Sequence, residues 1–446
     1  MMRKLKEQGI SLIYISHKMD EIFEICDDVS VLRDGNLVMT KRTSDTNMNE
    51  LVSAMVGRSL DNRFPPVDNV PGDNVLSVQH LSTKFDPHLV DITFDVRKGE
   101  IFGLYGLVGA GRTELLETIF GIRTRAAGRV YFRDRLMNFS SARDAMEHGF
   151  ALITEERKAN GLFLKGDLTF NTTIANLDQY KSGPALSNDK MLRATNKEIK
   201  TMHTKCMGPD DLISSLSGGN QQKVIFGKWL ERYPQVFLMD EPLSNLDAKL
   251  RNQMRAEIIK LRERIDTTFI YVTHDQTEAM TLGDRIVIMK DGFIQQIGTP
   301  QEVFDHPANL FVAGFIGVPQ MNFFDARLSR RDGKYTVTVG SVTVELSPEK
   351  QQRLAAHNVA EQDVTLGVRP DHIMLCADGV KGTVDVSEMM GSSVHLHVTA
   401  EGKDVIIIVP TNGAAAHFPM GSEVNMIFGG NVAHVFDKTT GKNLEW

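Results

Sequence analysis

A glycine-rich loop between an apolar segment and a helix-like segment restricts the fold more than any other feature of the chain. The loop, residues 106–113 (GLVGAGRT), follows the apolar run IFGLY and precedes the run ELLETIFGI. These flanking runs predict a buried strand before the loop and a helix after it. Glycines in such a turn let backbone N–H groups surround phosphate oxygens, and the helix adds its positive N-terminal end. The pattern predicts an α/β domain with a phosphate-binding loop, with a purely structural turn as the alternative.

The loop matches the phosphate-binding pattern GxxxxG[K][ST] at every defined position except one. Arg112 stands where the pattern has lysine, and Thr113 supplies the hydroxyl that such loops offer to Mg²⁺. The two cations are not equivalent, because the arginine guanidinium is bulkier, planar and presents a fork of donors. The candidate phosphate-binding residues are Gly106, Leu107, Val108, Gly109, Ala110, Gly111, Arg112 and Thr113.

A second candidate element is the apolar run VFLMDEP, residues 236–242, which ends in two carboxylates. Asp240 at the end of the predicted strand would hold Mg²⁺ through water. Glu241 would polarise an attacking water molecule as a general base. A strand that ends in two acidic residues can also lead into a solvated turn. Its place after a glycine loop in an α/β pattern favours the catalytic interpretation.

The third and most specific element is LSGGNQQ, residues 216–222, which precedes the helical run KVIFGKWLERY. Ser217, Gly218 and Gly219 place a hydroxyl and free backbone amides at a helix start, which suits a terminal phosphate. At this point the chain resembles the ATP-binding cassette (ABC) ATPase family, whose signature motif is LSGGQ or a close variant. The resemblance implies ATP and Mg²⁺ as ligands. It also implies head-to-tail pairing with a second ABC domain, in a homo- or heterodimer, with ATP between one glycine loop and the other LSGG segment.

Other residues of the chain are assigned by their resemblance to motifs of the family. Residues 244–249 (SNLDAK) resemble the D-loop, which places Asp247 near the dimer seam. His274 resembles the switch histidine that contacts the terminal phosphate and links hydrolysis to domain closure. Glu155 falls where the family has a glutamine that ligates Mg²⁺ and senses the transporter, so it adds a charge there. Phe85 is a weak candidate for the aromatic residue that stacks on adenine.

An internal repeat indicates how the chain is organised. Residues 13–35 align without gaps with residues 270–292, and each copy predicts a buried strand, a histidine, a short helix and a second strand closed by an Asp-Gly turn. Only twelve residues precede the first copy, so no glycine loop accompanies it. Residues 1–66 are therefore predicted to be the C-terminal remnant of a first ABC domain, in which His17 is vestigial. Residues 67–74 are predicted to be a linker.

The rest of the chain is predicted to form two domains. Residues 75–310 are expected to be the α/β P-loop ABC ATPase domain. Residues 311–446 begin with a linker and then contain several short strand-like runs separated by turn residues. Such spacing is typical of a small all-β barrel or sandwich, which the resemblance specifies as an OB-like (TOBE) regulatory domain.

The two halves of the chain resemble the ATPases of two different kinds of sugar importer. Residues 1–242 resemble tandem-cassette importers of monosaccharides, especially the galactose/methyl-galactoside type, in GLVGAGRTE, TEERK and LSGGNQQKV. Residues 243–446 resemble the ATPases of oligosaccharide importers in LSNLDAKLR, GTPQEVFDHPAN and, within the β-rich tail, GVRPDHI. The change occurs near Asp240 to Leu243, which suggests a composite of two sugar-importer ATPases. Sequencing of the genomic locus tests this, since one reading frame flanked by sugar-permease genes would show that the composite is genuine.

Composition limits the classes of partner. A net charge of −7 gives no electrostatic reason to expect nucleic acid or an anionic membrane as a ligand. No apolar run is long enough for a membrane span, and the N-terminal segment lacks the pattern of a signal peptide. The three separated cysteines are expected to be reduced thiols. The chain is therefore expected to be cytoplasmic, docked peripherally at the cytoplasmic face of the cell membrane.

Three functions compete at this stage. The first is an ATP hydrolase that energises a carbohydrate importer, with membrane-embedded permease subunits and, indirectly, a sugar-binding protein as partners. The second is a regulatory or catalytically impaired cassette that binds ATP without efficient turnover, because Arg112 and Glu155 alter the handling of phosphate and Mg²⁺. The third is an ABC protein of DNA repair or translation, against which the acidic balance and the sugar-type tail argue.

Overall fold

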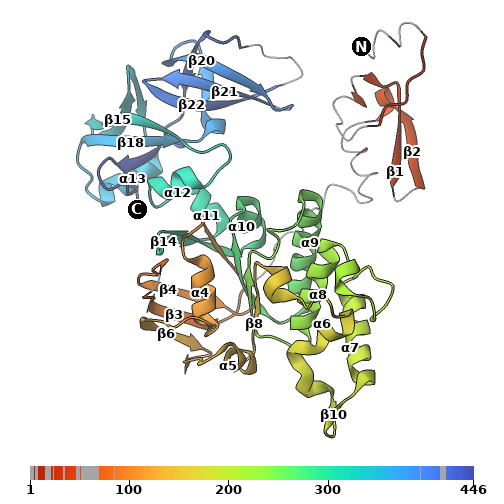
Figure 1. Ribbon diagram of the computed structural model, residues 1–446. Helices are drawn as coiled ribbons and strands as arrows, with labels where there is room; N and C mark the ends of the chain where they lie inside the picture. Colours follow the sequence, from red (N-terminus) through yellow and green to blue (C-terminus); the bar gives the residue numbers. More distant parts are fainter. Residues whose placement is uncertain are drawn as a thin grey trace. The chain divides into compact units, whose positions relative to one another are not determined.

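The computed structural model divides the chain into two units, residues 1–68 and residues 69–446 (Figure 1). His17 and Phe85 lie outside the residues that the structure describes, as do residues 67–69 of the predicted linker. The described residues are 5, 9–15, 22–23, 25–33, 36–46, 51, 70–84, 86–391, 393–411 and 418–446.

The first unit contains one antiparallel hairpin, formed by β1 (Asp28–Arg33) and β2 (Asn36–Arg42), followed by the 3₁₀ helix η1 (Thr43–Asp45). This confirms the hairpin predicted for the first repeat copy. The strand predicted before it is wrong for residues 13–15, which have no regular structure and leave Ile13 and Ile15 almost fully exposed. The equivalent strand of the second copy is buried between two neighbours in a sheet, whereas no strand of the described part of the chain pairs with residues 13–15.

The second unit is built on a six-stranded sheet in the order β14-β13-β5-β12-β11-β8. All pairings are parallel except that of β13 with β14. Parallel strands of this kind are buried on both faces, which explains the continuous apolar runs in the sequence. The strands are β5 (Ile101–Gly106), β8 (Phe150–Ile153), β11 (Val236–Asp240), β12 (Thr268–Thr273), β13 (Arg285–Lys290) and β14 (Phe293–Gly298).

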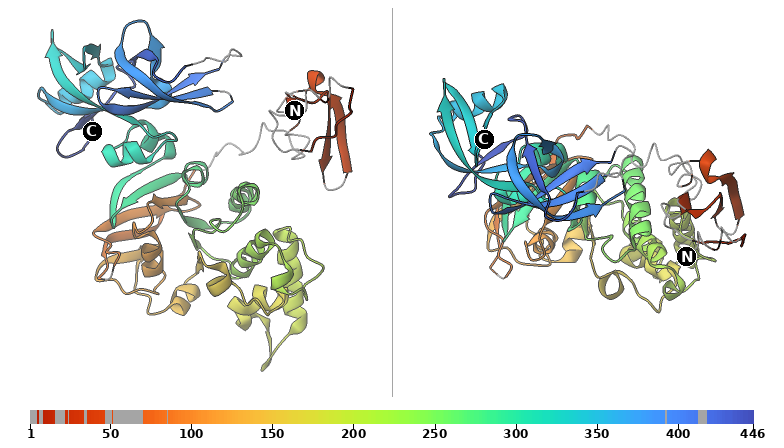
Figure 2. Two further views of the ribbon diagram at one scale, coloured as in Figure 1. Left: turned by 45° about the horizontal axis from the view of Figure 1, so that its top comes forward. Right: turned by 90° about the horizontal axis from the view of Figure 1, so that it is seen from above.

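Alternate residues of the parallel strands pack into two different cores. Val236 and Leu238 of β11 face a core shared with helix α4 (Arg112–Ile119) and a four-stranded antiparallel sheet, whereas Phe237 and Met239 face a helical core. Figure 2 shows the helices of residues 168–230, in yellow to green, on the far side of the six-stranded sheet from the antiparallel strands. The antiparallel sheet comprises β4 (Ile92–Arg97), β3 (Asn74–Ser82), β6 (Ala127–Phe132) and β7 (Arg135–Met137).

Helices surround the second core and carry the connections between the strands. The α-helices between the strands, of which α5 packs on the first core, are α5 (Ala142–Glu147), α6 (Leu168–Thr173), α7 (Asn188–Thr201), α8 (Gly218–Leu230), α9 (Ala248–Arg264) and α10 (Gln276–Leu282). Shorter pieces are the π-helix η3 (Arg157–Gly161), the 3₁₀ helices η4 (Ile174–Tyr180) and η5 (Ile213–Ser215), and the small strands β9 (Lys181–Ser182) and β10 (Ala185–Leu186).

The C-terminal part is all-β in its core, as predicted. Two five-stranded sheets, in the orders β17-β16-β15-β18-β24 and β19-β23-β20-β21-β22, enclose one apolar core. Helices α11 (Pro300–Asp305) and α12 (Leu310–Phe315) lead into it, and α13 (Pro348–Ala356) and η6 (Pro370–His372) lie within it. The strands are β15 (Asn322–Arg331), β16 (Lys334–Val339), β17 (Val342–Glu345), β18 (Gln362–Val368), β19 (Met374–Cys376), β20 (Val380–Met389), β21 (Ser393–Ala400), β22 (Lys403–Pro410), β23 (Glu423–Ile427) and β24 (His434–Asp437).

A buried histidine in this β-rich part predicts a loss of stability in mild acid. Burial, with the nearby cations Lys350 and Arg369, lowers the pKa of His434 to about 2. In the unfolded chain a histidine becomes protonated as the pH falls below about 6.5, and this favours the unfolded state. The free energy of unfolding that the neutral His434 contributes is therefore complete above that pH and is lost progressively below it. When the pH falls from 7 to 5, we expect the free energy of unfolding, measured with urea, to drop by about 2 kcal/mol more in the wild type than in His434→Leu. Equal losses in the two proteins would contradict a neutral His434 in the folded state.

Candidate functional site

Three candidate segments meet at the carboxyl edge of the six-stranded sheet. The glycine loop follows β5, Asp240 ends β11 with Glu241 directly after it, and His274 follows β12. The carboxyl ends of parallel strands share one edge of a sheet, which brings these segments together. The first direct contact is a hydrogen bond of 3.0 Å from Thr113 Oγ1 to Asp240 Oδ1.

The glycines of the loop are required by its geometry. Gly109 and Gly111 have φ angles of 82° and 90°, in the left-handed region that side chains with a Cβ disfavour. A Cβ on Gly106 would lie 2.5 Å from the Met289 carbonyl oxygen, and one on Gly111 would lie 2.6 Å from Leu89. The loop therefore needs glycine for its shape, independently of any ligand.

Arg112 connects the loop to the two strands beside it. Its guanidinium is 3.1 Å from Glu241 Oε1, and it also donates a short hydrogen bond to the Thr273 carbonyl oxygen. The side chain is only 6% exposed, and its Nε has no hydrogen-bond partner among the described residues. The fork that distinguishes arginine from lysine is thus used to bridge β11 and β12.

Both carboxylate oxygens of Glu241 are occupied. While Oε1 contacts Arg112, Oε2 is 2.6 Å from Nδ1 of His274. The residue has a φ of 41°, and its carbonyl oxygen accepts hydrogen bonds from the backbone N–H and the hydroxyl of Ser244. Because the Glu241 side chain is 10% exposed, it does not lie in a solvated turn.

Burial at this edge opposes ionisation of Asp240 and of Arg112. Burial raises the pKa of Asp240 to about 7, the carboxylates of Glu241 and Glu155 add to the effect, and the Thr113 hydrogen bond opposes it. Burial lowers the pKa of Arg112, and the same three carboxylates counteract this. Phosphate and a divalent cation bring charges of both signs, which would compensate such groups.

Glu155 lies at the edge of this cluster. It follows β8, which pairs with β11, and its charge acts on both Arg112 and Asp240. Its backbone carbonyl accepts a hydrogen bond of 3.3 Å from the Asn245 side chain, whereas its exposed carboxylate has no partner in the described part of the chain. The carboxylate is therefore available to a ligand.

The LSGG segment begins α8 and is not bonded to the glycine loop within the described chain. The Ser217 hydroxyl accepts a hydrogen bond of 3.0 Å from Asn220, and the Gly218 carbonyl accepts one of 3.2 Å from Arg157. A Cβ on Gly219 would lie 2.5 Å from Leu250 of α9, so this glycine permits close packing of the two helices. One chain thus supplies the loop and the LSGG segment at separate places.

Asp247 starts α9. Its carboxylate accepts a hydrogen bond of 2.9 Å from the Leu250 N–H and thereby caps the helix, while the side chain stays exposed. The capping role is local, and it leaves one oxygen free at the surface. The resemblance alone places Asp247 at a dimer seam.

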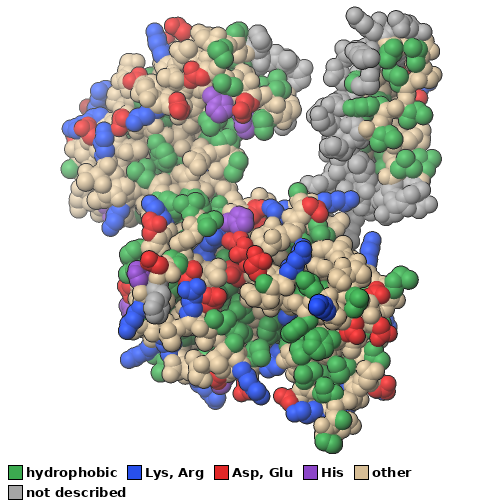
Figure 3. Space-filling view, viewed as in Figure 1, with side chains coloured by type: hydrophobic (Ala, Val, Ile, Leu, Met, Phe, Trp, Pro, Cys, Tyr) green, Lys and Arg blue, Asp and Glu red, His purple; other side chains and the backbone are tan. Residues whose placement is uncertain are grey.

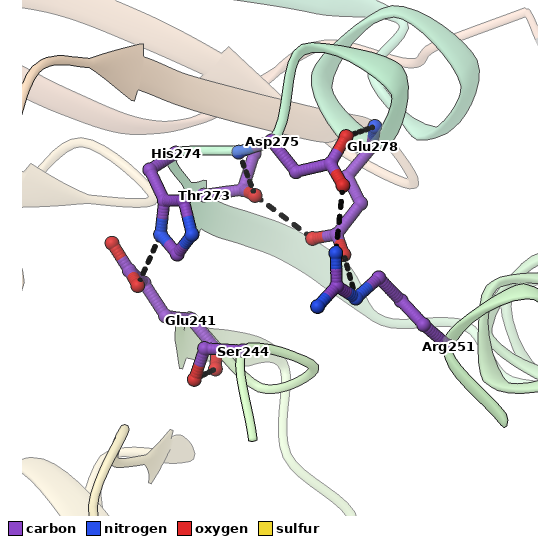
Figure 4. Close-up of a pocket in the computed structure, with 7 residues that line it drawn as sticks. All are labelled: Glu241, Ser244, Arg251, Thr273, His274, Asp275 and Glu278. Carbon is purple, nitrogen blue, oxygen red and sulfur yellow. Dashed lines mark hydrogen bonds and ion pairs between the residues drawn. The ribbon is translucent and has the colours of Figure 1, made fainter. Parts of the chain in front are cut away.

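A small pocket lies beside Glu241 and His274 (Figure 4). Sequence reasoning did not single out three of its charged residues, Arg251, Asp275 and Glu278. A signal existed, because Asp275 followed three positions later by Glu278 is a typical helix-start pattern. Figure 3 shows acidic side chains gathered with a histidine on the surface near α10. The pocket is lined by Glu241, Ser244, Arg251, Thr273, His274, Asp275 and Glu278.

Comparison with known families identifies the α/β part. Residues 89–244 match the model of the ABC transporter family. These residues therefore carry an ABC transporter domain. Residues 317–373 match the MalK OB fold domain and residues 366–436 match the TOBE domain, which confirms the predicted character of the β-rich part.

Curated relatives belong to one type of importer. The chain is 53% identical over 304 residues to the galactose/methyl galactoside import ATP-binding protein MglA of Treponema denticola, covering 67% of this chain and 61% of the relative. The Treponema pallidum protein of the same name is 49% identical with the same coverage. The Escherichia coli protein is 41% identical over 296 residues, covering 66% of this chain and 58% of the relative. This chain thus spans about three fifths of these relatives.

The two kinds of match agree with the composite character inferred from the sequence. MglA proteins match two thirds of the chain, and the C-terminal part matches a domain named for MalK. Within the described residues, no helix is both long and apolar enough to cross a membrane.

Proposed function

We propose that this chain binds and hydrolyses ATP to power an ABC-type carbohydrate importer. The observation that carries the proposal is the meeting of the Thr113–Asp240 pair and the Glu241–His274 pair beneath one glycine loop. The similarity to galactose/methyl galactoside import proteins supports a sugar as the transported substrate.

The loop and its neighbours fit a nucleotide phosphate with Mg²⁺. Thr113 and Asp240 place a hydroxyl and a carboxylate oxygen 3.0 Å apart, and Mg²⁺ prefers such oxygen donors together with phosphate and water. Glu155 is a third candidate ligand. Bound Mg²⁺ would neutralise charge on the terminal phosphates. The buried Arg112 Nε without a partner is a further donor that a phosphate oxygen would satisfy.

Glu241 is the proposed general base. Its carboxylate accepts the proton of a water molecule as that water attacks the terminal phosphorus of ATP, and the bond from phosphorus to the ADP oxygen breaks. His274 holds the other carboxylate oxygen and would contact the released phosphate. Because Arg112 neutralises Glu241 in this structure, the phosphate must draw the guanidinium away before Glu241 acts.

A second ABC domain is proposed to complete the site. Ser217, Gly218 and Gly219 lie at the start of α8 and do not bond to the glycine loop of the same chain. In a head-to-tail dimer the partner's LSGG segment would cover the terminal phosphate, with Asp247 near the seam. Either a second copy of this chain or a different cassette could supply it.

The remaining assignments follow the same proposal. Residues 1–66 are assigned to the remnant of a first ABC domain, residues 67–74 to a linker, residues 75–310 to the ABC domain, and residues 311–446 to a linker and a TOBE-like regulatory domain. Membrane-embedded permease subunits would dock the chain at the cytoplasmic face of the membrane. A sugar-binding protein would contribute indirectly, by delivering the sugar to the permease.

Sugar uptake tests the proposed function. Cells that contain the permease genes adjacent to this gene would be assayed for uptake of labelled galactose and labelled maltose, with and without the chain. We expect uptake of one of these sugars to depend on the wild-type chain and to be absent with Glu241→Gln. Uptake that is the same without the chain would contradict the proposal.

A further inference from the structure

Arg251 of α9 contacts two segments that flank the proposed catalytic pair, and Figure 4 shows its contacts with the first of them, at Asp275 and Glu278. Its guanidinium donates a hydrogen bond of 3.1 Å to Asp275, and its Nε is 3.8 Å from Glu278. It also donates a hydrogen bond of 3.2 Å to the carbonyl oxygen of Leu246, in the loop that carries Ser244 to Asp247. One side chain therefore joins α9, the start of α10 and the loop after Glu241.

The groups that Arg251 reaches on the α10 side fix the backbone on both sides of His274. The Asp275 N–H donates a 2.9 Å hydrogen bond to the Thr273 hydroxyl, and that hydroxyl donates a 2.8 Å bond to Glu278. Tyr271 of β12 donates a second bond of 2.8 Å to the same Glu278 oxygen. His274 is thus held between two residues of one buried polar network.

On the other side, the loop that receives Arg251 also fixes Glu241. Ser244 donates two hydrogen bonds to the Glu241 carbonyl, and Leu246 of the same loop accepts the bond from Arg251. A guanidinium can hold a carboxylate and a carbonyl oxygen at once because its donors form a rigid fork, whereas a lysine ammonium is a single point of charge.

We propose that Arg251 is a positioning residue that keeps His274 in place beside Glu241 by joining the 244–247 loop to Asp275. The inference rests on the proposed ATPase function and extends it. Movement of the 244–247 loop, for example when a second ABC domain docks on it, would pass through Arg251 to the backbone of His274. Arg251 itself touches neither Glu241 nor His274 and acts only through these loops.

Four variants separate positioning from general stabilisation. Arg251→Ala removes every contact, and Arg251→Lys keeps the charge but not the fork. Asp275→Asn removes the charge opposite Arg251 while its amide oxygen can still cap α10, as asparagine does. Arg264→Ala is the matched control, because Arg264 is an exposed arginine in the last turn of the same helix.

Steady-state ATP hydrolysis is the first readout. We expect Arg251→Ala to lower kcat about tenfold, with KM for ATP, ADP affinity and Tm close to those of Arg264→Ala. Arg251→Lys should recover part of the loss, and Arg251→Ala/Asp275→Asn should be no slower than Arg251→Ala alone. A kcat of Arg251→Ala within twofold of the control, or a parallel loss of ADP affinity and Tm, would overturn the proposal.

Amide hydrogen exchange is the second readout, and it does not depend on turnover. We expect Arg251→Ala to raise exchange in residues 244–250 and in residues 273–278 together, with no change in Arg264→Ala. Exchange that rises in one segment only, or in neither, would overturn the link. Absence of hydrolysis in the wild type would instead refute the ATPase function, and the exchange result would still decide the role of Arg251.

Discussion

Glu241→Gln is expected to lower kcat for Mg²⁺-dependent ATP hydrolysis by a factor on the order of 10³, within the range that general bases contribute. Glutamine fills the same buried space between Arg112 and His274, so the fold of the site should survive. Its amide cannot accept the proton of the attacking water at neutral pH. The loss should therefore appear in turnover, measured as phosphate release, and not in nucleotide binding.

ADP affinity serves as the control for Glu241→Gln. The variant removes the negative charge that neutralises Arg112, which frees the guanidinium for phosphate. We therefore expect ADP to bind at least as tightly as to the wild type in calorimetric titration. Turnover within a few-fold of the wild type would exclude Glu241 as the base.

Arg112→Ala is expected to lower ADP affinity about 100-fold, because one charge-assisted contact to phosphate contributes about 1.5–3 kcal/mol. It should also lower the free energy of unfolding by about 3–5 kcal/mol, since the Glu241 carboxylate is left buried without its cation. Arg112→Lys restores the charge, and it cannot bridge Glu241 and Thr273 as the fork does. We expect its hydrolysis to equal or exceed that of the wild type.

For both Arg112 variants, calorimetry measures the ADP affinity, urea unfolding measures the free energy of unfolding, and phosphate release measures hydrolysis. The combination of Arg112→Ala with Glu241→Gln should recover much of the lost stability, because the unpaired buried charge is then removed. If Arg112→Ala keeps wild-type ADP affinity, Arg112 does not hold phosphate. If Arg112→Lys hydrolyses ATP far more slowly than the wild type, position 112 of this chain requires arginine for hydrolysis.

The sequence motifs, together with the resemblance to the ABC family, were sufficient to predict the segments of the site. The glycine loop, Asp240 and His274 each follow an apolar run, and parallel strands bring their carboxyl ends to one edge. The β-rich tail was also predictable, because its short strands are separated by turn residues. The glycine loop and the β-rich tail follow from local patterns, whereas the assignment of His274 depended on the family resemblance.

Two other features could not be predicted, because they depend on side-chain contacts between distant parts of the chain. The bond from Arg112 to Glu241 depends on how the fork is directed in the packed site. The contacts of Arg251 with Asp275 and Leu246 depend on where α9 packs. The strand wrongly predicted near Ile13 and Ile15 has the opposite cause, since its local pattern is strand-like but no strand among the described residues pairs with it.

Single-turnover phosphate release from the purified wild-type chain tests the central claim most directly. Labelled ATP would be bound to an excess of protein, and release of phosphate would be followed after addition of Mg²⁺ or of a chelator. The proposed site predicts release that requires Mg²⁺ and is absent in Glu241→Gln. Tight ATP binding without release, or release that persists in Glu241→Gln, would contradict it, and the first of these results would favour a regulatory cassette.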